Sequence, residues 1–377
     1  MRPKSRWGWS GGTLIAAIVL AGCAASAPSH RAHPGRRPSP AQRATPFTSP
    51  AVSPGTDALS CSLPIYGTSV AAQSSGGQPM GGLLQLPSGT VAPVPGTGVV
   101  AVAGAFSEWQ TQSAPALFGD VREESYDPSL AQWVPASPAE LAPSGTQYAY
   151  VSVGDIAAPG TTSVQVHLVT ISTASDQIIY SQGQTAVLGW NGGQLLLVEH
   201  APTSNHTEGL LSLDPATASA VTLQPAVNGV EWYLASGAEV WGGQSNPADA
   251  SPPQVEVPWD EALRYDLTTG KVAVWSYHPG DQVTVVGTTA SGDPLETVQG
   301  TAQTSLVVAT SPSSAITLLT GPGLASAHGL SVYSTFTDAN GTWVATDQGL
   351  YLLTPALKLV QEQMGNFANA TIVGPCG

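Results

Sequence analysis

Positive charge is scarce in most of this 377-residue chain. Only four of its eleven Lys and Arg residues lie beyond residue 60, whereas 24 of its 25 Asp and Glu residues do, a balance of about −20. Such a surface repels a phosphate backbone, so we exclude nucleic-acid binding. Four basic side chains are also too few for a sialidase-type arginine cluster. Cations, sugars, peptides and basic protein partners are left as candidate ligands.

Helical patterning and catalytic signatures are also absent. Beyond residue 60 there is no amphipathic helical stretch, which excludes a helical bundle. No serine beyond residue 60 stands in a G-x-S-x-G turn, so the nucleophile elbow of α/β-hydrolases is missing from this region. We interpret His167, in the strand VQVHLV, as a packed residue. The loop EHAPTSNHTEG at 199–209 has only loose metal-ligand spacing, and TDANGTW at 337–343 lacks the closing Glu of a calcium loop.

What is present is a hairpin pattern, seen clearly in LRYDLTTGKVAVW at 263–275. Leu263 and Tyr265 alternate with polar neighbours before the turn, and Val272 and Val274 do so after it. Period-two alternation indicates half-buried strands. Asp and Gly in the DLTTGK segment favour a tight turn, since the carboxylate bonds nearby backbone and Gly tolerates positive φ. The segment therefore predicts a β-hairpin.

Similar hairpins recur along the chain. They begin at Leu83, Ser125, Leu168, Leu210, Leu263, Ser305 and Leu350, with spacings of 42, 43, 42, 53, 42 and 45 residues. A fixed period of about 40–50 residues is typical of propellers, and each period holds about four short strands. We therefore predict an all-β fold for residues 60–377, a single seven-bladed β-propeller with four-stranded antiparallel blades.

Both ends of this region carry a strand with a cysteine. CSLPIYGTS precedes the first hairpin, and NATIVGPC follows the last. A propeller ring leaves exposed strand edges unless it closes, so we expect the C-terminal strand to pair with the N-terminal strands in one blade. We expect a Cys61–Cys376 disulfide across this pairing, worth about 4–5 kcal/mol in the loop-entropy model. The alternative is two buried free thiols.

The first 59 residues have a different composition. Arg2, Lys4 and Arg6 precede the apolar run TLIAAIVLAG, which is typical of a signal peptide and short for a membrane span. The run ends in LAGC, Leu20 to Cys23, which resembles the lipobox of bacterial lipoproteins. The resemblance implies that residues 1–22 are removed and that Cys23 is lipidated; the alternative is a plain secretory signal. Residues 23–59 are rich in Pro, Ser, Ala and Arg and predict a disordered tether.

Two hairpins resemble a known repeat family. YDPSLAQW, from Tyr126 to Trp133, and VWGG followed by LRYDLTTGKV resemble kelch repeats. The other hairpins are similar to the looser WD40-like and TolB-like bacterial propellers, and no G-H…W-D signature is present. The resemblance implies a propeller and says little about activity, because propellers host both binding and catalysis.

Long connections between the second strand and the outer hairpin mark a candidate binding face. They occur in the second to fifth units, and in a propeller they emerge on one side. This candidate loop face holds Trp109, His206, Glu208, Trp259, Asp260 and Glu261. Aromatic and acidic side chains suit contacts with carbohydrate or cationic peptide, although Trp259 alternatively pins its own loop. The strand tryptophans are expected in the core, namely Trp190, Trp232, Trp241, Trp275 and Trp343.

We therefore expect an exported, lipid-anchored monomer outside the bacterial cell membrane, or in the periplasm or outer membrane of a Gram-negative cell. It would act as a recognition or scaffold module for a glycan, a peptide or an envelope protein, with the lipid as its only membrane contact. We expect no cofactor, no metal and no catalytic residue. The alternative function is an extracellular polysaccharide hydrolase or lyase with its site in the propeller funnel. Two or three converging carboxylates there would favour the enzyme.

Overall fold

The computed structural model describes residues 53–54, 59–67, 80–93, 125–128, 132–134, 136–153, 164–200, 207–246, 259–323, 330–364, 367 and 370–377. All of them belong to one compact unit, Ala44–Gly377. The predicted signal peptide, the lipidation site Cys23 and most of the tether lie outside the described residues, as do Trp109 and His206. Within the described part of the chain no helix is long and apolar enough to cross a membrane.

All seven predicted hairpins pair as antiparallel strands. They are β3 (Met80–Leu86) with β4 (Thr90–Pro93), β5 (Ser125–Asp127) with β6 (Gln132–Val134), β8 (Val164–Thr170) with β9 (Ser175–Tyr180), β12 (Thr207–Asp214) with β13 (Ser219–Asn228), β16 (Glu261–Asp266) with β17 (Lys271–Tyr277), β20 (Gln303–Ser311) with β21 (Ser314–Pro322), and β24 (Gly349–Leu353) with β25 (Leu359–Met364).

The hairpin at residues 263–275 shows why these turns form locally. The Asp266 Oδ1 accepts hydrogen bonds from the backbone N–H groups of Thr268 and Thr269, at 2.8 and 3.1 Å. Gly270 closes the turn with φ of +67°, a conformation that a residue with Cβ adopts at a cost. The predicted turn chemistry is confirmed at these residues.

Further strands precede the outer hairpins and complete the blades. Four units contain a first and a second strand in antiparallel order, namely β10 (Gln184–Asn191) and β11 (Gln194–His200), β14 (Val230–Ser236) and β15 (Glu239–Gln244), β18 (Gln282–Thr288) and β19 (Pro294–Gln299), and β22 (Val332–Asp338) and β23 (Gly341–Thr346). β7 (Gln147–Val153) pairs with β8, and the short 3-10 helix η2 (Ile171–Thr173) links β8 to β9. β1 (Ser53–Pro54) pairs in parallel with β25.

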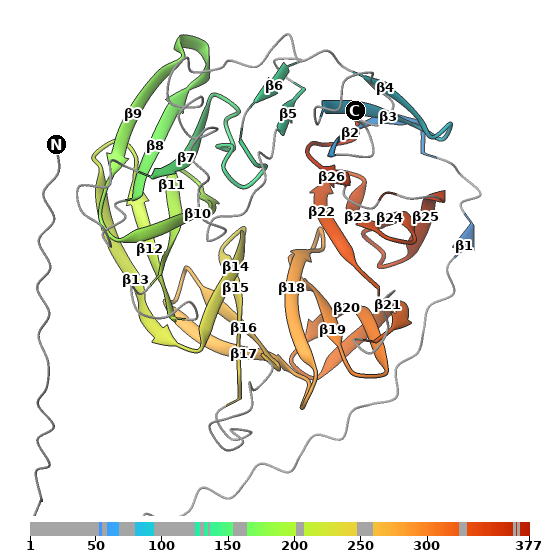
Figure 1. The fold of residues 1–377 in the computed structure, drawn as a ribbon. Helices are drawn as coiled ribbons and strands as arrows, with labels where there is room; N and C mark the ends of the chain where they lie inside the picture. The colour runs from blue at the N-terminus through green and yellow to red at the C-terminus, as the bar shows by residue number, and fades with distance from the viewer. Residues whose placement is uncertain are drawn as a thin grey trace, which may run out of the picture. The chain divides into compact units, whose positions relative to one another are not determined.

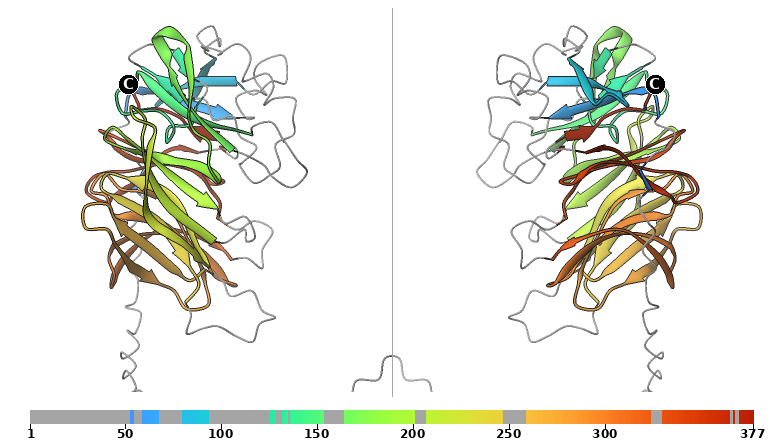
Figure 2. Two further views of the ribbon diagram at one scale, coloured as in Figure 1. Left: turned by 90° about the vertical axis from the view of Figure 1, so that its left-hand side faces the viewer. Right: turned by 90° about the vertical axis from the view of Figure 1, so that its right-hand side faces the viewer.

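The blades are arranged in a ring (Figure 1). The first strands β10, β14, β18 and β22 contact one another in sequence on the inner side, and β22 contacts β26 (Ala370–Ile372). Figure 2 views the same sheets from two sides, with the strands of each blade running between the two faces of the ring. The fold is an all-β propeller built from four-stranded antiparallel blades.

The number of blades differs from the prediction. The described strands form six sheets, so the prediction of seven separate blades is wrong. Thr207 of β12 pairs in parallel with Val230 of β14, which joins two four-stranded units into one eight-stranded sheet. Only Gly229 separates β13 from β14, and this short link keeps the two units together. The repeat in the sequence gives the number of hairpins. The number of separate sheets also depends on whether neighbouring units are joined by backbone hydrogen bonds.

The last strand, β26, lies in one sheet with β2, which stands early in this unit. β26 pairs antiparallel with β2 (Cys61–Gly67), and the strand order is β26-β2-β3-β4. Cys61 and Cys376 form the predicted disulfide, with Cα atoms 5.6 Å apart. The backbone N–H of Ser62 also donates to the Gly377 carbonyl at 2.8 Å. The C-terminal strand is therefore held by a covalent bond as well as by its short ladder.

Each first strand carries the same irregularity. The register against the second strand shifts at Val187/Gly189, Trp232/Leu234, Val285/Gly287 and Val332/Ser334. Such bulges increase the local twist and redirect side chains. At Gly287 a Cβ would lie 2.3 Å from the Thr335 hydroxyl, which instead donates to the Val286 carbonyl at 2.7 Å. The bulges therefore let neighbouring inner strands approach closely.

Aromatic side chains fill much of the space between sheets. Trp133, Trp241 and Trp343 are among the largest fully buried side chains, and Trp232 is also buried. The core prediction is confirmed for Trp232, Trp241 and Trp343. Trp190 and Trp275 are only half-buried. This difference leaves Trp190 available to line a cavity.

Candidate functional site

Glu208, predicted on the loop face, is buried inside a blade. Its Oε2 accepts a hydrogen bond from the Trp232 backbone N–H at 2.6 Å, and its Oε1 lies 3.1 Å from His200 Nδ1. These contacts link β11, β12 and β14 at the point where the two halves of the eight-stranded sheet join. Glu208 therefore has a structural role in that junction.

Asp260 and Glu261 are likewise internal. The Asp260 Oδ1 accepts from the Asn246 backbone N–H at 2.8 Å, and Glu261 Oε2 accepts from Gln244 Nε2 at 2.5 Å. Both carboxylates are buried, and Asp260 is 1% exposed. The half-buried Trp259 accepts at its carbonyl from the Val283 N–H at 2.6 Å. Trp259, Asp260 and Glu261 are consecutive residues at the start of β16. The two carboxylates among them accept hydrogen bonds from other parts of the fold.

The structure removes the three acidic residues from the candidate loop face. The three acidic members are buried rather than presented to solvent, because each already accepts hydrogen bonds within its blade. Trp109 and His206 lie outside the described residues. Ligand binding by this face stays a prediction, and it depends on the aromatic residues and His206 rather than on the carboxylates.

Both carboxylate oxygens of Asp338 accept hydrogen bonds within the fold. Its Oδ1 accepts from the Asn340 N–H at 2.7 Å, and its Oδ2 accepts from Trp343 Nε1 and from the Cys376 N–H, both at 2.9 Å. The carboxylate therefore fastens the C-terminal segment to the β22–β23 turn. Among the described residues no group of three or more His, Cys, Asp and Glu side chains is placed to hold a metal ion.

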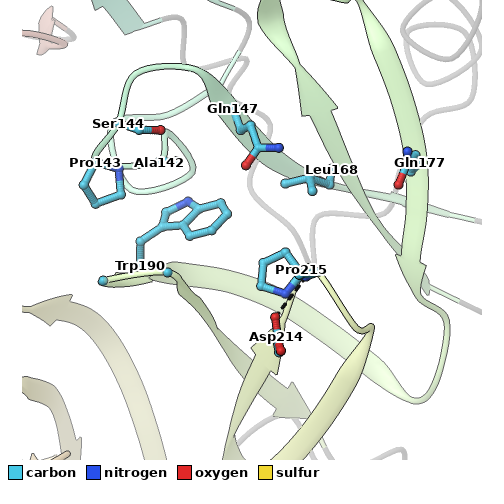
Figure 3. Close-up of a pocket in the computed structure, with 12 residues that line it drawn as sticks. Ala142, Pro143, Ser144, Gln147, Leu168, Gln177, Trp190, Asp214 and Pro215 are labelled. Atoms are coloured by element: carbon cyan, nitrogen blue, oxygen red, sulfur yellow. Dashed lines mark hydrogen bonds between the residues drawn. The ribbon is translucent and has the colours of Figure 1, made fainter.

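A cavity of about 430 Å³ lies between β7–β9 and the blade β10–β13. Its walls include the turns β10–β11 and β12–β13, which emerge on the same edge of their blade because alternate connections of an antiparallel meander do so. Strand ends that the predicted long connections join, such as His200 of β11 and Thr207 of β12, lie on the opposite edge. We call this hollow the turn-face cavity (Figure 3). It was not predicted from the sequence.

The turn-face cavity combines one aromatic ring with polar groups. Trp190, Gln147 and Leu168 face it in Figure 3, with Pro215 and Asp214 on the side of the β12–β13 turn. Indole Nε1 of Trp190 donates to the Glu140 carbonyl at 2.8 Å, and this bond fixes the ring orientation. An apolar wall with a few convergent polar groups is typical of a small-ligand site.

Asp214 supplies negative charge at the rim. The Thr217 hydroxyl donates to Oδ2 at 2.8 Å, and the Ala216 N–H donates to Oδ1 at 2.9 Å. The Thr217 bond and then the Ala216 bond hold the pKa of the Asp214 carboxyl below its ordinary value, although the side chain is exposed. Asp214 is therefore ionised at neutral pH and favours a neutral or cationic ligand.

No protein-family model matches the chain, and no curated protein matches it. Among solved structures, TolB from Acinetobacter baumannii is similar at 11% identity over 82% of this chain and 66% of its own, with a TM-score of 0.42. The β-propeller domain of the Trilobed protease from Pyrococcus furiosus is similar at 11% identity over 62% of this chain and 70% of its own, with a TM-score of 0.41. Oligogalacturonate lyase from Vibrio parahaemolyticus is similar at 11% identity over 55% of this chain and 62% of its own, with a TM-score of 0.35.

Likeness at this level extends to the fold alone. The chain spans 66% of the TolB chain and 62% of the lyase chain, and the propeller assignment rests on its own strand pairing. The functions of TolB, the protease and the lyase are therefore not assigned to this chain.

Proposed function

We propose that this protein is a lipid-anchored propeller outside the cytoplasm that recognises a glycan or a peptide. The observation that carries the proposal is the turn-face cavity, which is lined by the Trp190 ring, two amides and an ionised carboxylate. The acidic balance beyond residue 60 favours neutral or cationic ligands over anionic ones. An envelope protein with a basic surface is the corresponding protein partner for a scaffold role.

The hydrolase or lyase alternative has less support. Sugar-cleaving enzymes generally need paired carboxylates that reach the substrate. Asp338, on the inner strand β22, has both oxygens engaged by Asn340, Trp343 and Cys376. The buried Asp260 and Glu261 accept internal hydrogen bonds as well. We therefore favour binding over polysaccharide cleavage.

Replacing Trp190 by Ala tests the binding proposal. The chain with Cys23→Ser, which removes the predicted lipidation, is applied to glycan and peptide arrays, and the affinity for any hit is measured by calorimetry. We expect Trp190→Ala to weaken binding at least about tenfold, because an aromatic contact in a desolvated pocket is worth about 1.4 kcal/mol or more.

Trp275→Ala is the matched control. Its indole is also half-buried and also donates to a backbone carbonyl, that of Ala309 at 2.9 Å, but it does not line the turn-face cavity. We expect unchanged affinity from this variant. An affinity that survives Trp190→Ala moves the site elsewhere, and Trp259→Ala then tests the candidate loop face.

Lipid anchoring at Cys23 is tested separately. Bacteria that express the full chain are grown with labelled palmitate, and we expect the label on the wild-type protein but not on Cys23→Ser. Globomycin, which inhibits the lipoprotein signal peptidase, is expected to cause accumulation of the uncleaved precursor. An unlabelled wild-type protein in the culture medium would show a plain secretory signal instead.

A further inference from the structure

Three side chains on β7, β8 and β9 are hydrogen-bonded in series. Ser152 Oγ lies 2.8 Å from His167 Nε2, and His167 Nδ1 lies 3.0 Å from Asp176 Oδ1. Each residue comes from a different strand of one sheet, so the order Ser–His–Asp is produced by strand pairing. The connectivity is that of a nucleophile, its base and the group that orients the base.

The register of the sheet accounts for this arrangement. Tyr150 lies opposite His167, and Ser152 is two residues further along β7, so period-two alternation places all three on one face. The pairing of β8 with β9 shifts between Val166 and His167. Bulges commonly redirect a side chain, and this one stands directly beside the imidazole.

Tyr150 contacts both His167 and Asp176. Its ring stacks on the His167 ring with centroids 4.6 Å apart and planes 18° apart, and its hydroxyl donates to Asp176 Oδ2 at 2.8 Å. Burial, followed by the Asp176 hydrogen bond, raises the pKa of Tyr150 above its ordinary value. The phenol therefore stays a neutral donor, and Asp176 accepts with both oxygens.

The tautomer follows from these contacts. Asp176 as a carboxylate only accepts, so Nδ1 of His167 carries the proton and donates it. In the neutral imidazole Nε2 is then the lone-pair nitrogen and accepts from the Ser152 hydroxyl. The His167 side chain is 10% exposed, which limits rotation, and Ser152 is part-exposed near the end of β7.

We propose that Ser152 is an activated nucleophile that gives this protein a hydrolytic activity toward small carboxylic esters. Ser152 Oγ bonds to the ester carbonyl carbon while its proton passes to His167 Nε2. The C–O bond to the alcohol then breaks, and His167 Nε2 returns the proton to the leaving alkoxide. Water attacks the acyl-Ser152 with His167 as base, releasing the carboxylic acid and restoring the serine hydroxyl. Asp176 and Tyr150 are positioning residues.

A second cluster in the chain provides a matched control. Ser276, His278 and Glu296 contain the same kinds of side chain, but Ser276 Oγ donates to Glu296 Oε1 at 2.8 Å rather than to an imidazole. His278 Nε2 lies 3.7 Å from Glu296 Oε2. A serine that donates to a carboxylate gains no imidazole base in this arrangement, so Ser276 is expected to be unreactive.

The test is covalent labelling of the full chain with a fluorophosphonate probe, with the modified residue located by peptide mass spectrometry. We expect an adduct on Ser152 that is absent from Ser152→Ala and unchanged in Ser276→Ala. His167→Gln is expected to slow labelling at least about 100-fold, the scale of a lost general base. Hydrolysis of p-nitrophenyl acetate is expected to fall in parallel.

Folding is monitored for each variant by circular dichroism and Tm. Asp176→Asn keeps the shape of the side chain, and we expect slower labelling at an almost unchanged Tm, whereas a merely structural role would lower Tm and leave the Ser152 rate in the folded fraction intact. Three results would each overturn the proposal. They are the absence of a Ser152 adduct, equal labelling of Ser276, and a labelling rate that His167→Gln does not change. None of these results depends on ligand binding at Trp190.

Discussion

Replacing both Cys61 and Cys376 by Ala lowers the free energy of unfolding by about 4–5 kcal/mol, the upper end of the range for removal of a native disulfide. The bond joins residues 315 apart in sequence, so without it the unfolded chain regains a very large loop. In the folded state β26 has only three residues, so its ladder with β2 is short. Urea unfolding monitored by circular dichroism measures the change.

Cys23→Ser is the control for this experiment, because Cys23 is not part of the bridge. We expect its unfolding curve to match that of the wild type. A double variant whose free energy of unfolding falls by less than about 1 kcal/mol would show that the β26–β2 pairing holds the C-terminal end without the disulfide.

Trp343→Ala has the second large expected effect, a loss of about 3–5 kcal/mol. The side chain is fully buried among Leu63, Leu350 and Ile372, between the β26-β2-β3-β4 sheet and the last blade. Removal leaves a cavity in this packing and takes away the indole donor to Asp338. Thermal unfolding followed by circular dichroism provides the measurement.

Trp343→Phe separates packing from hydrogen bonding. Phe keeps most of the ring volume but lacks the indole N–H, so we expect a loss of about 1–3 kcal/mol. Equal losses from Phe and Ala would place the effect in the Asp338 hydrogen bond rather than in the core. An unchanged Tm in Trp343→Ala would contradict the packing account.

The hairpins were predictable because their signals are local. Asp266 and Gly270 shape one turn through hydrogen bonds and backbone freedom within five residues. The disulfide was predictable for a different reason, since only two cysteines lie beyond the predicted lipidation site and each marks one end of the repeat.

The candidate site was much less predictable. Glu208, Asp260 and Glu261 look like surface acids in the sequence, yet each accepts a hydrogen bond from another strand or connection. Conversely, His167 resembles an ordinary strand residue until pairing of β7, β8 and β9 brings Ser152 and Asp176 to its two nitrogens. No spacing rule reveals such partners, because they depend on register across three strands.

The sequence by itself determined the strand-rich class, the seven hairpins, the acidic surface balance and the pairing of Cys61 with Cys376. Tertiary structure decided that the hairpins form six sheets, that three predicted site acids are buried, and that Trp190 and His167 stand at the sites proposed here. The physical reason is the range of the interactions. Turns are stabilised by neighbours in the chain, whereas shared ladders and side-chain networks depend on strands tens of residues apart.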